Sequence, residues 1–165
     1  MEKYSNKSVR RQDRLLIEED GLELLQNGEY GVLSFVDMTD GEASAYAVPM
    51  SYVWNEDGYV YMHCAPEGYK IDCIKHNNRV CLTIVGSTNV VSDKFTTAYE
   101  SIILRGNIER SLSAEERMFA LKLILKKYSP NNFEIGVKYA EKSFSRTEIL
   151  RINIKSISGK SKRVM

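Results

Sequence analysis

Residues 45–64 read AYAVPMSYVWNEDGYVYMHC, and this stretch decides the fold class. Two runs rich in valine, methionine and aromatic residues flank the polar segment NEDG at 55–58, a pattern typical of two strands joined by a hairpin turn. Pro49 cannot donate a ladder hydrogen bond, and it therefore indicates an edge strand or a break in the first run. The stretch predicts a hairpin whose first strand is irregular.

Runs of similar composition lie on both sides of this hairpin. They are YGVLSFVD (30–37), RVCLTIVG (79–86), AYESIILRGNIERS (98–111) and EILRINIKSIS (148–158). Gly106 inside the third run predicts a bulge or bend. Six strands in short hairpins, with peripheral helices, favour a mainly β, α+β fold built as a small antiparallel barrel over a parallel sheet.

Helical periodicity appears in separate segments. Leucines at near-helical spacing predict an amphipathic helix over 13–26, although Gly21 weakens that prediction. Residues 67–78 predict a short helix, and 111–128 form the clearest helix, in which Ser113 and Glu116 make a capping-box pattern. The remaining two segments are 131–146, interpreted as a loop with a short helix around 137–144, and a basic tail at 159–165.

Composition sets the class of protein. The chain has 165 residues, 43% of them apolar, which favours a single domain over 1–165. Lys plus Arg number 23 and Asp plus Glu 22, so no net field favours nucleic acid or a membrane surface. That charge balance favours a small-molecule ligand. The odd count of three cysteines, a polar N-terminus and the lack of a long apolar run predict a soluble cytoplasmic protein.

The segment HCAPEGYK (63–70) suggests several kinds of site. Cys73 and His76 have C-x2-H spacing, but structural zinc sites usually pair two such knuckles, and a free cysteine is more often a buried small hydrophobe. We therefore expect no metal. A thiol nucleophile at Cys64 is also disfavoured, because the neighbouring His63 on the same strand points to the opposite face.

Phosphate binding is a further alternative for the same segment. A loop that leaves a strand and enters a helix presents free backbone N–H groups to an anion. Gly68 permits close approach of the backbone, and Lys70 adds a full charge. An ordinary helix start with a surface lysine has the same pattern. The sequence contains neither G-x-x-x-x-G-K-[ST] nor G-x-G-x-x-G.

Pro49 suggests a second half of such a site. A strand broken there leaves backbone groups around Val48, Met50 and Ser51 free to pair with the edge of a planar heterocycle such as a flavin. A plain edge strand explains the proline equally well.

The order of these motifs resembles a known family. The segments are RRQDR (10–14), YGVLSF, AVPMSYVW, VYMHCAPEGYKIDCIKHNNRVCLTIV, YESIILRGNIE and ISGK. Together they resemble the nitroimidazole-resistance flavoproteins of the pyridoxamine-phosphate-oxidase-like superfamily. The resemblance is strongest over 46–85 and weakest over 131–146.

This resemblance implies a split β-barrel that forms a homodimer and holds a flavin, FMN or the larger FAD, in a cleft between the subunits. It also implies the site residues. The isoalloxazine edge would be lined by Val48, Pro49, Met50 and Ser51, and Met62, His63, Cys64 and Ala65 would pass beside the cofactor. Gly68 and Lys70 would hold the phosphate, Ser101 would offer a hydroxyl, and Lys160 would lie near the cofactor or the dimer contact.

The implied activity is reduction of a nitroimidazole to the amine, with His63 next to the substrate as the proton donor. A core histidine bonded to backbone is the alternative for His63. Two other functions remain open: a flavin-binding protein without enzymatic activity, and another split-barrel protein that acts on a pyridoxamine phosphate or handles haem, for which His63 and His76 are the histidines available as axial ligands. Strands 30–37 and 45–54 are apolar at nearly every position, which favours a subunit interface.

Overall fold

The computed structural model describes residues 3–56 and 58–164. Asp57 of the expected turn, and the terminal residues Met1, Glu2 and Met165, lie outside the described part. The α-helices are α1 (Glu18–Asn27), α2 (Tyr69–His76), α3 (Ala114–Tyr128) and α4 (Phe133–Ser143). The strands are β1 (Tyr30–Asp37), β2 (Ser44–Ser51), β3 (Val53–Asn55), β4 (Tyr59–Cys64), β5 (Arg79–Val91), β6 (Thr96–Glu109) and β7 (Glu148–Lys162). Short 3-10 turns cover Gln12–Arg14, Ser92–Lys94, Pro130–Asn132 and Phe144–Arg146.

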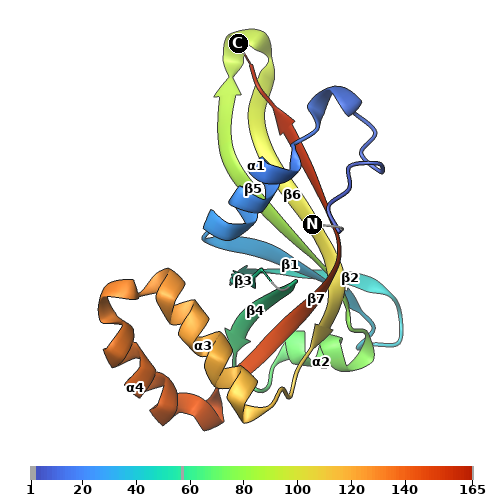
Figure 1. Cartoon of the computed structure of the whole chain (residues 1–165). Coiled ribbons are helices and arrows are strands. Elements are labelled where there is room, and N and C mark those ends of the chain that lie inside the picture. The colour runs from blue at the N-terminus through green and yellow to red at the C-terminus, as the bar shows by residue number, and fades with distance from the viewer. Residues whose placement is uncertain (1–2, 57, 165) are drawn as a thin grey trace.

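All described strands belong to one antiparallel sheet in the order β2-β1-β5-β6-β7-β4-β3. Strands β2 and β3 are the two edges of this sheet, yet only Tyr52 separates them in the chain. The sheet must therefore curl until its two edges meet, as Figure 1 shows. No ladder joins β2 to β3 among the described residues, so the sheet is not a hydrogen-bonded closed barrel.

The predicted mainly β antiparallel fold with peripheral helices is confirmed, but the number of strands differs. The sheet has seven strands and not six, because the run expected as one strand over 45–54 is broken at Tyr52 into β2 and β3. The bulge predicted at Gly106 is confirmed by a register shift between Arg105 and Gly106 in the β6–β7 ladder.

A tyrosine side chain replaces the missing ladder partner at this break. The N–H of Tyr52 donates to the hydroxyl oxygen of Tyr128 at 2.9 Å. That hydroxyl lies 2.7 Å from the carbonyl oxygen of Tyr52 and 2.5 Å from the carbonyl oxygen of Glu29, to either of which it can donate. The fully buried Tyr52 side chain donates its own hydroxyl to the carbonyl oxygen of Leu25 at 2.8 Å. The break thus keeps its polar backbone groups hydrogen-bonded.

Two hydrophobic cores lie on opposite faces of β4. Val60 and Met62 point into the main core inside the curled sheet. Every strand except β2 and β3 contributes buried residues to this core. Tyr61 points the other way, into a second core with Ile149 and the apolar face of α3 and α4. At the end of β4, Cys64 packs against the main core, whereas His63 is exposed.

The first helix begins later than predicted. It covers Glu18–Asn27, whereas Leu15 forms a bridge with Lys160 and Leu16 is buried in the main core in extended backbone. Gly21 lies within this helix, at a position where any side chain would overlap the ring of Tyr4. The close approach of that ring explains why a residue of low helix propensity is tolerated.

The segment 131–146 is more helical than predicted. Helix α4 covers Phe133–Ser143 and packs against α3 as the lower-left hairpin in Figure 1. The expected cap of α3 is confirmed, since the Ser113 side chain accepts a hydrogen bond from the Glu116 N–H at 3.2 Å. The segment expected as a basic tail is largely strand, because β7 continues to Lys162. No described helix is both long and apolar enough to cross a membrane.

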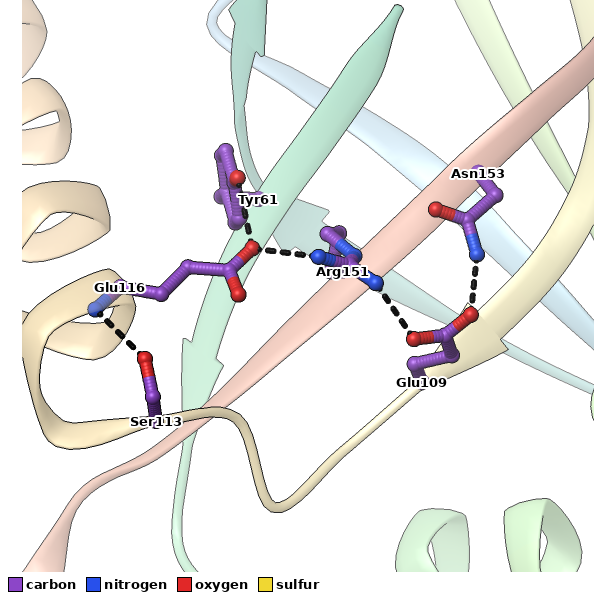
Figure 2. Close-up of polar contacts among 6 residues, drawn as sticks. All are labelled: Tyr61, Glu109, Ser113, Glu116, Arg151 and Asn153. Atoms are coloured by element: carbon purple, nitrogen blue, oxygen red, sulfur yellow. Dashed lines mark hydrogen bonds and ion pairs between the residues drawn. The ribbon is translucent and has the colours of Figure 1, made fainter.

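An arginine ties α3 to the sheet. Arg151 on β7 donates to Glu116 of α3 at 2.6 Å and to Glu109 of β6 at 2.5 Å, as Figure 2 shows. Tyr61 donates to the same oxygen of Glu116 at 2.9 Å, and Asn153 donates to Glu109. The Glu116 carboxylate is thus used for this network, and no contact from it back to the backbone of Ser113 accompanies the cap.

Candidate functional site

The edges of β2 and β4 flank the break at Tyr52. Strand β2 pairs only with β1, so its other edge is free of ladder partners. Strand β4 pairs with β3 only through Tyr59–Tyr61, which leaves 62–64 without a partner on that side. Val48, Met50 and Cys64 all pack against the main core. Two strand segments with backbone groups outside any ladder therefore border the same part of the curled sheet, and such groups are available to a ligand.

Strand parity divides the predicted residues of β2. Val48 and Met50 are half-buried toward the main core, whereas Pro49 and Ser51 are exposed on the outer face. Side chains from all four therefore do not line one surface. Met62 is fully buried, so its side chain is core and only its backbone is available to a ligand. Ala65 is exposed in the loop that follows β4.

The start of α2 has free hydrogen-bond donors. Gly68 is its N-cap residue with φ 120°, and no side chain caps the helix. The Gly68 carbonyl accepts from Ile71 and Asp72, so the N–H groups of Tyr69 and Lys70 precede the first helical hydrogen bond. Space beside Gly68 is open, with no atom within 4 Å of where a Cβ would lie. This geometry is suited to an anion.

Charged side chains surround Cys64 near this helix start. Burial raises the pKa of the Cys64 thiol, and Glu148 raises it further, whereas Lys70 and Arg110 act in the opposite direction. Arg110 lies 3.8 Å from the Glu148 carboxylate. The thiol pKa stays above its ordinary value, so Cys64 is protonated at neutral pH and is not an activated nucleophile. Arg110, which sequence reasoning missed, is a second cation that acts on Cys64.

A hydrogen-bonded tether holds α2 against the end of β1. The Tyr69 hydroxyl donates to Asp37 at 2.5 Å. Asp37 also accepts from the N–H of Thr39 at 3.0 Å and from its hydroxyl at 2.7 Å. These bonds, that of Tyr69 first, lower the pKa of the Asp37 carboxyl to about 2. The tether fixes the residue next to Lys70, and so it positions the helix start.

We expect Asp37→Asn to destabilise the protein in a pH-dependent manner. Because the folded pKa of about 2 lies below the ordinary value of about 3.9, the ionised carboxylate stabilises the fold fully above about pH 4 and progressively less as the pH falls toward 2. The variant should be less stable at pH 7 and should lose less stability between pH 4 and 2. Urea unfolding across this range measures both effects. Asp93→Asn, at an exposed position, is the control and should keep the parent pH dependence.

His63 and Ser51 line one cavity. This cavity has a volume of about 390 Å³ and lies between β4, α3 and α4. The His63 side chain is exposed at its mouth, but the surrounding protein desolvates the imidazole in part and lowers its pKa below the ordinary value of 6.5. A neutral imidazole therefore predominates at neutral pH, and its protonated form is a stronger acid than free histidine.

Ser101 and Lys160 form a separate pair. They are direct cross-strand partners on β6 and β7, and the Lys160 ammonium lies 5.9 Å from the centre of the Tyr99 ring. On β7, Lys160 lies twelve residues beyond Glu148, the cross-strand partner of Cys64, which is about 40 Å along an extended strand. Within one subunit, this pair is thus not next to the helix start that holds Gly68 and Lys70.

The outer face of the sheet is apolar between these two regions. Pro49, Val32, Thr83 and Ile103 are successive cross-strand partners from β2 to β6, and partners in register share a face. Val32 is 38% and Ile103 37% exposed. Ser101 lies two residues from Ile103 on the same face. The exposed residues Pro49 and Ser51 and the half-buried Ser101 are therefore on one face of the sheet.

The cysteines and histidines do not assemble. Cys64, Cys73 and Cys81 are free thiols, and within residues 3–56 and 58–164 no group of three or more His, Cys, Asp or Glu side chains is placed to hold a metal ion. His76 is engaged on its own helix, with Nδ1 2.9 Å from the carbonyl oxygen of Asp72.

The chain is similar in sequence and in fold to known proteins. A sequence model of the family described as pyridoxamine 5'-phosphate oxidase matches residues 18–161. No curated protein sequence gives a match. One similar structure is a Bacteroides thetaiotaomicron protein provisionally assigned to 5-nitroimidazole antibiotic resistance, with 22% identity, a TM-score of 0.71, and 90% of this chain and 86% of that chain covered.

Two further similar structures are described as cofactor-binding proteins. An FAD-binding protein from Mesorhizobium loti has 20% identity and a TM-score of 0.61, with 91% of this chain and 98% of that chain covered. An FAD- and haem-binding protein from Mycobacterium smegmatis has 16% identity and a TM-score of 0.68, with 93% and 75% covered. At these identities the matches establish a shared fold.

Proposed function

Because this chain belongs to the pyridoxamine 5'-phosphate oxidase family, we propose that it is a flavin-binding oxidoreductase that reduces nitroimidazole-type nitro compounds to amines. The cofactor is FMN, with FAD as the larger alternative, and it lies between two copies of the chain. The description of the Bacteroides structure supports the choice of substrate, and those of the two FAD-binding structures support the choice of cofactor.

The uncapped start of α2 is the observation that carries the proposal. Free N–H groups of Tyr69 and Lys70, open space at Gly68 and the Lys70 ammonium are the donor set that a phosphate requires. Lys70 is half-buried and makes no hydrogen bond or ion pair with any described residue. A cation left without a partner beside free helix donors fits the phosphate of a flavin mononucleotide.

The unpaired edges of β2 and β4 fit the rest of the cofactor. Backbone groups of Val48–Ser51 and of 62–64 lack ladder partners on the side of the break, and a flavin ring carries donors and acceptors along one edge. A bound flavin supplies the electron transfer, and the protein supplies position, exclusion of water and protons. Reduction of a nitro group to an amine takes up six electrons and six protons and releases two molecules of water, so a nicotinamide donor would have to reduce the bound flavin three times. His63, at the mouth of the adjoining cavity, is the group that donates protons.

A second copy completes the site. The apolar outer face with Pro49, Val32 and Ile103 needs a cover, and it carries Ser51 at one side and the Ser101–Lys160 pair at the other. Docking of two such faces would place Ser101 and Lys160 of the second subunit near the first subunit's flavin.

We expect Lys70→Ala to weaken flavin binding by about 1–2 kcal/mol, or roughly tenfold, since a partly exposed charge-assisted hydrogen bond contributes this much. Flavin absorbance after dialysis, and titration of the apoprotein with FMN, measure the change. Lys75→Ala, at the other end of α2, removes a lysine that pairs with Asp72 and should leave flavin binding unchanged. Equal occupancy in the two variants contradicts the phosphate assignment.

The reductase activity is tested under anaerobic conditions. The purified protein is first examined for a flavin spectrum, and a Soret band in its place would favour haem. The flavin is then reduced with one equivalent of a nicotinamide donor and mixed with 2-methyl-5-nitroimidazole, which should reoxidise it. In a second sample the donor is in more than threefold excess over the nitro compound, which supplies the six electrons for the amine product measured by mass spectrometry. If the reduced flavin persists in the presence of the nitro compound, the protein binds a flavin for another purpose.

A further inference from the structure

We propose that the cavity between α3, α4 and the end of β4 binds the substrate, and that it selects a small, planar and uncharged ring compound. The inference rests in part on the proposed function, because it takes Ser51, at one end of the cavity, to lie on the flavin side. The cavity volume of about 390 Å³ is near the lower end of the range of about 300–1,000 Å³ typical of small-molecule sites.

The cavity joins the two predicted regions that matter for reduction. Ser51 at the end of β2 and His63 at the end of β4 both line it. These residues come from the two sides of the break at Tyr52, so the space between them opens where the two strands diverge. A ring held there lies between the proposed flavin edge and the proposed proton donor.

The helical hairpin gives the cavity a rigid apolar wall. Gly136 of α4 lies against Leu125 of α3 so closely that a Cβ at 136 would be 2.5 Å from a Leu125 methyl carbon. The end of α4 is fixed by Arg117 of α3, which donates to the carbonyl oxygens of Phe144 and Thr147 at 2.7 and 2.5 Å. Its guanidinium also lies 4.2 Å from the centre of the Phe144 ring. The pocket is therefore formed before any ligand binds.

Several hydroxyl groups of the cavity wall already form hydrogen bonds within the protein. The Ser143 hydroxyl donates to the Tyr139 carbonyl at 3.0 Å, and the Thr147 hydroxyl donates to the Ser143 carbonyl at 3.0 Å. The Tyr128 hydroxyl is used at the strand break. Among the described residues that line the cavity there is no lysine, arginine or carboxylate. Among the described lining residues, His63 and the Tyr139 hydroxyl are the ionisable groups with no hydrogen bond to another described side chain. The lining therefore offers a charged ligand no lysine, arginine or carboxylate to compensate for its lost hydration.

A neighbouring groove differs from the cavity in that charged residues line it. On the other side of Ser51, an open groove of about 880 Å³ is lined by Lys126, Lys127 and Glu29. Charged compounds are better solvated there. The difference in lining charge between the two spaces predicts that the cavity with Ser51 and His63 discriminates against anions, because a charge that loses hydration without gaining a partner is costly.

Two matched substitutions on α4 and the turn after it test the pocket. Ser143→Leu places a larger side chain in the cavity wall, whereas Ser145→Leu makes the same change at an exposed position outside it. In the flavin-loaded protein, Ser143→Leu should raise KM for 2-methyl-5-nitroimidazole about tenfold or more, with flavin content unchanged. Ser145→Leu should match the parent protein. The anion 4-nitrobenzoate should be a poor substrate for all three proteins.

A binding measurement separates this inference from the reductase proposal. With alanine methyl groups labelled with carbon-13, the Ala140 methyl in the cavity wall should shift when 2-methyl-5-nitroimidazole is added to the parent protein, even if no reduction follows. An unshifted Ala140 methyl overturns the inference, as does unchanged KM in Ser143→Leu. Shifts without any turnover would sink the reductase proposal alone. The titration of the parent protein also decides the matter if Ser143→Leu does not fold.

Discussion

Arg151→Met is expected to lower the free energy of unfolding by about 2 kcal/mol, between the contribution of an exposed ion pair and the cost of breaking a buried one, because Glu109 is 44% exposed. The Arg151 side chain is only 20% exposed and joins two carboxylates, Glu109 and Glu116. Methionine keeps the apolar contact with the Tyr59 ring, over which the guanidinium lies at 4.8 Å. The loss therefore reports mainly on two carboxylates left without their cation. Urea unfolding at pH 7 measures it.

Two controls define this prediction. Arg11→Met removes an exposed ion pair with Asp13 and should change stability by less than about 1 kcal/mol. Arg151→Met combined with Glu109→Gln and Glu116→Gln should recover part of the loss, because neutral amides no longer need the cation. A change below about 1 kcal/mol for Arg151→Met would mean that the network in Figure 2 does not hold α3 to the sheet.

The network matters for the site because α3 carries one wall of the cavity. Glu116 is at the start of α3, and Leu125 and Tyr128 are at its end. If the network is lost, the helix loses its attachment to β6 and β7 near its first turn. We therefore place the structural support of the pocket some distance from His63, on residues that contact neither the proposed flavin nor the substrate.

The fold could be predicted from the sequence where local pattern decides the structure. Runs rich in valine, isoleucine and aromatic residues predicted the strands, and the S-x-x-E pattern predicted the start of α3, because both signals lie within a few neighbouring residues. The break at Tyr52 could not be predicted to the residue, since the hydroxyl that satisfies it comes from Tyr128, 76 residues later. Helix α4 was underestimated because Ile135 and Tyr139 are 70% and 71% exposed, which disturbs its apolar periodicity.

The candidate site likewise has features that could be predicted from the sequence and features that could not. Gly68 and Lys70 were predicted at a helix start by a local motif, and that position is confirmed. The tether from Asp37 to Tyr69 was not predicted, because it joins residues 32 positions apart. Asp37 and Thr39, which follow a strand as an Asx-type turn, were the available signal. The common cavity of Ser51 and His63 depends on the α3–α4 hairpin, which no local motif places beside β4.

Tyr128→Phe tests the strand break, and we expect a loss of about 2–3 kcal/mol in the free energy of unfolding. The variant keeps the ring but removes the hydroxyl that serves the N–H of Tyr52 and a carbonyl of Tyr52 or Glu29. Each buried polar group left without a partner costs about 1–3 kcal/mol. Tyr139→Phe is the matched control, because that side chain is 71% exposed, and it should change stability by less than about 0.5 kcal/mol.

Hydrogen exchange distinguishes a local effect from a general loss of stability. If the Tyr128 hydroxyl holds the break, the amide of Tyr52 should exchange faster in Tyr128→Phe than the drop in global stability explains. Amides within the β5–β6 ladder, far from the break, should change only with global stability. Ser51 is next to Tyr52, so the same variant should also weaken flavin binding if β2 carries the isoalloxazine edge. Loss of stability with parent flavin affinity would separate the break from the cofactor site and would contradict the proposed position of the flavin edge.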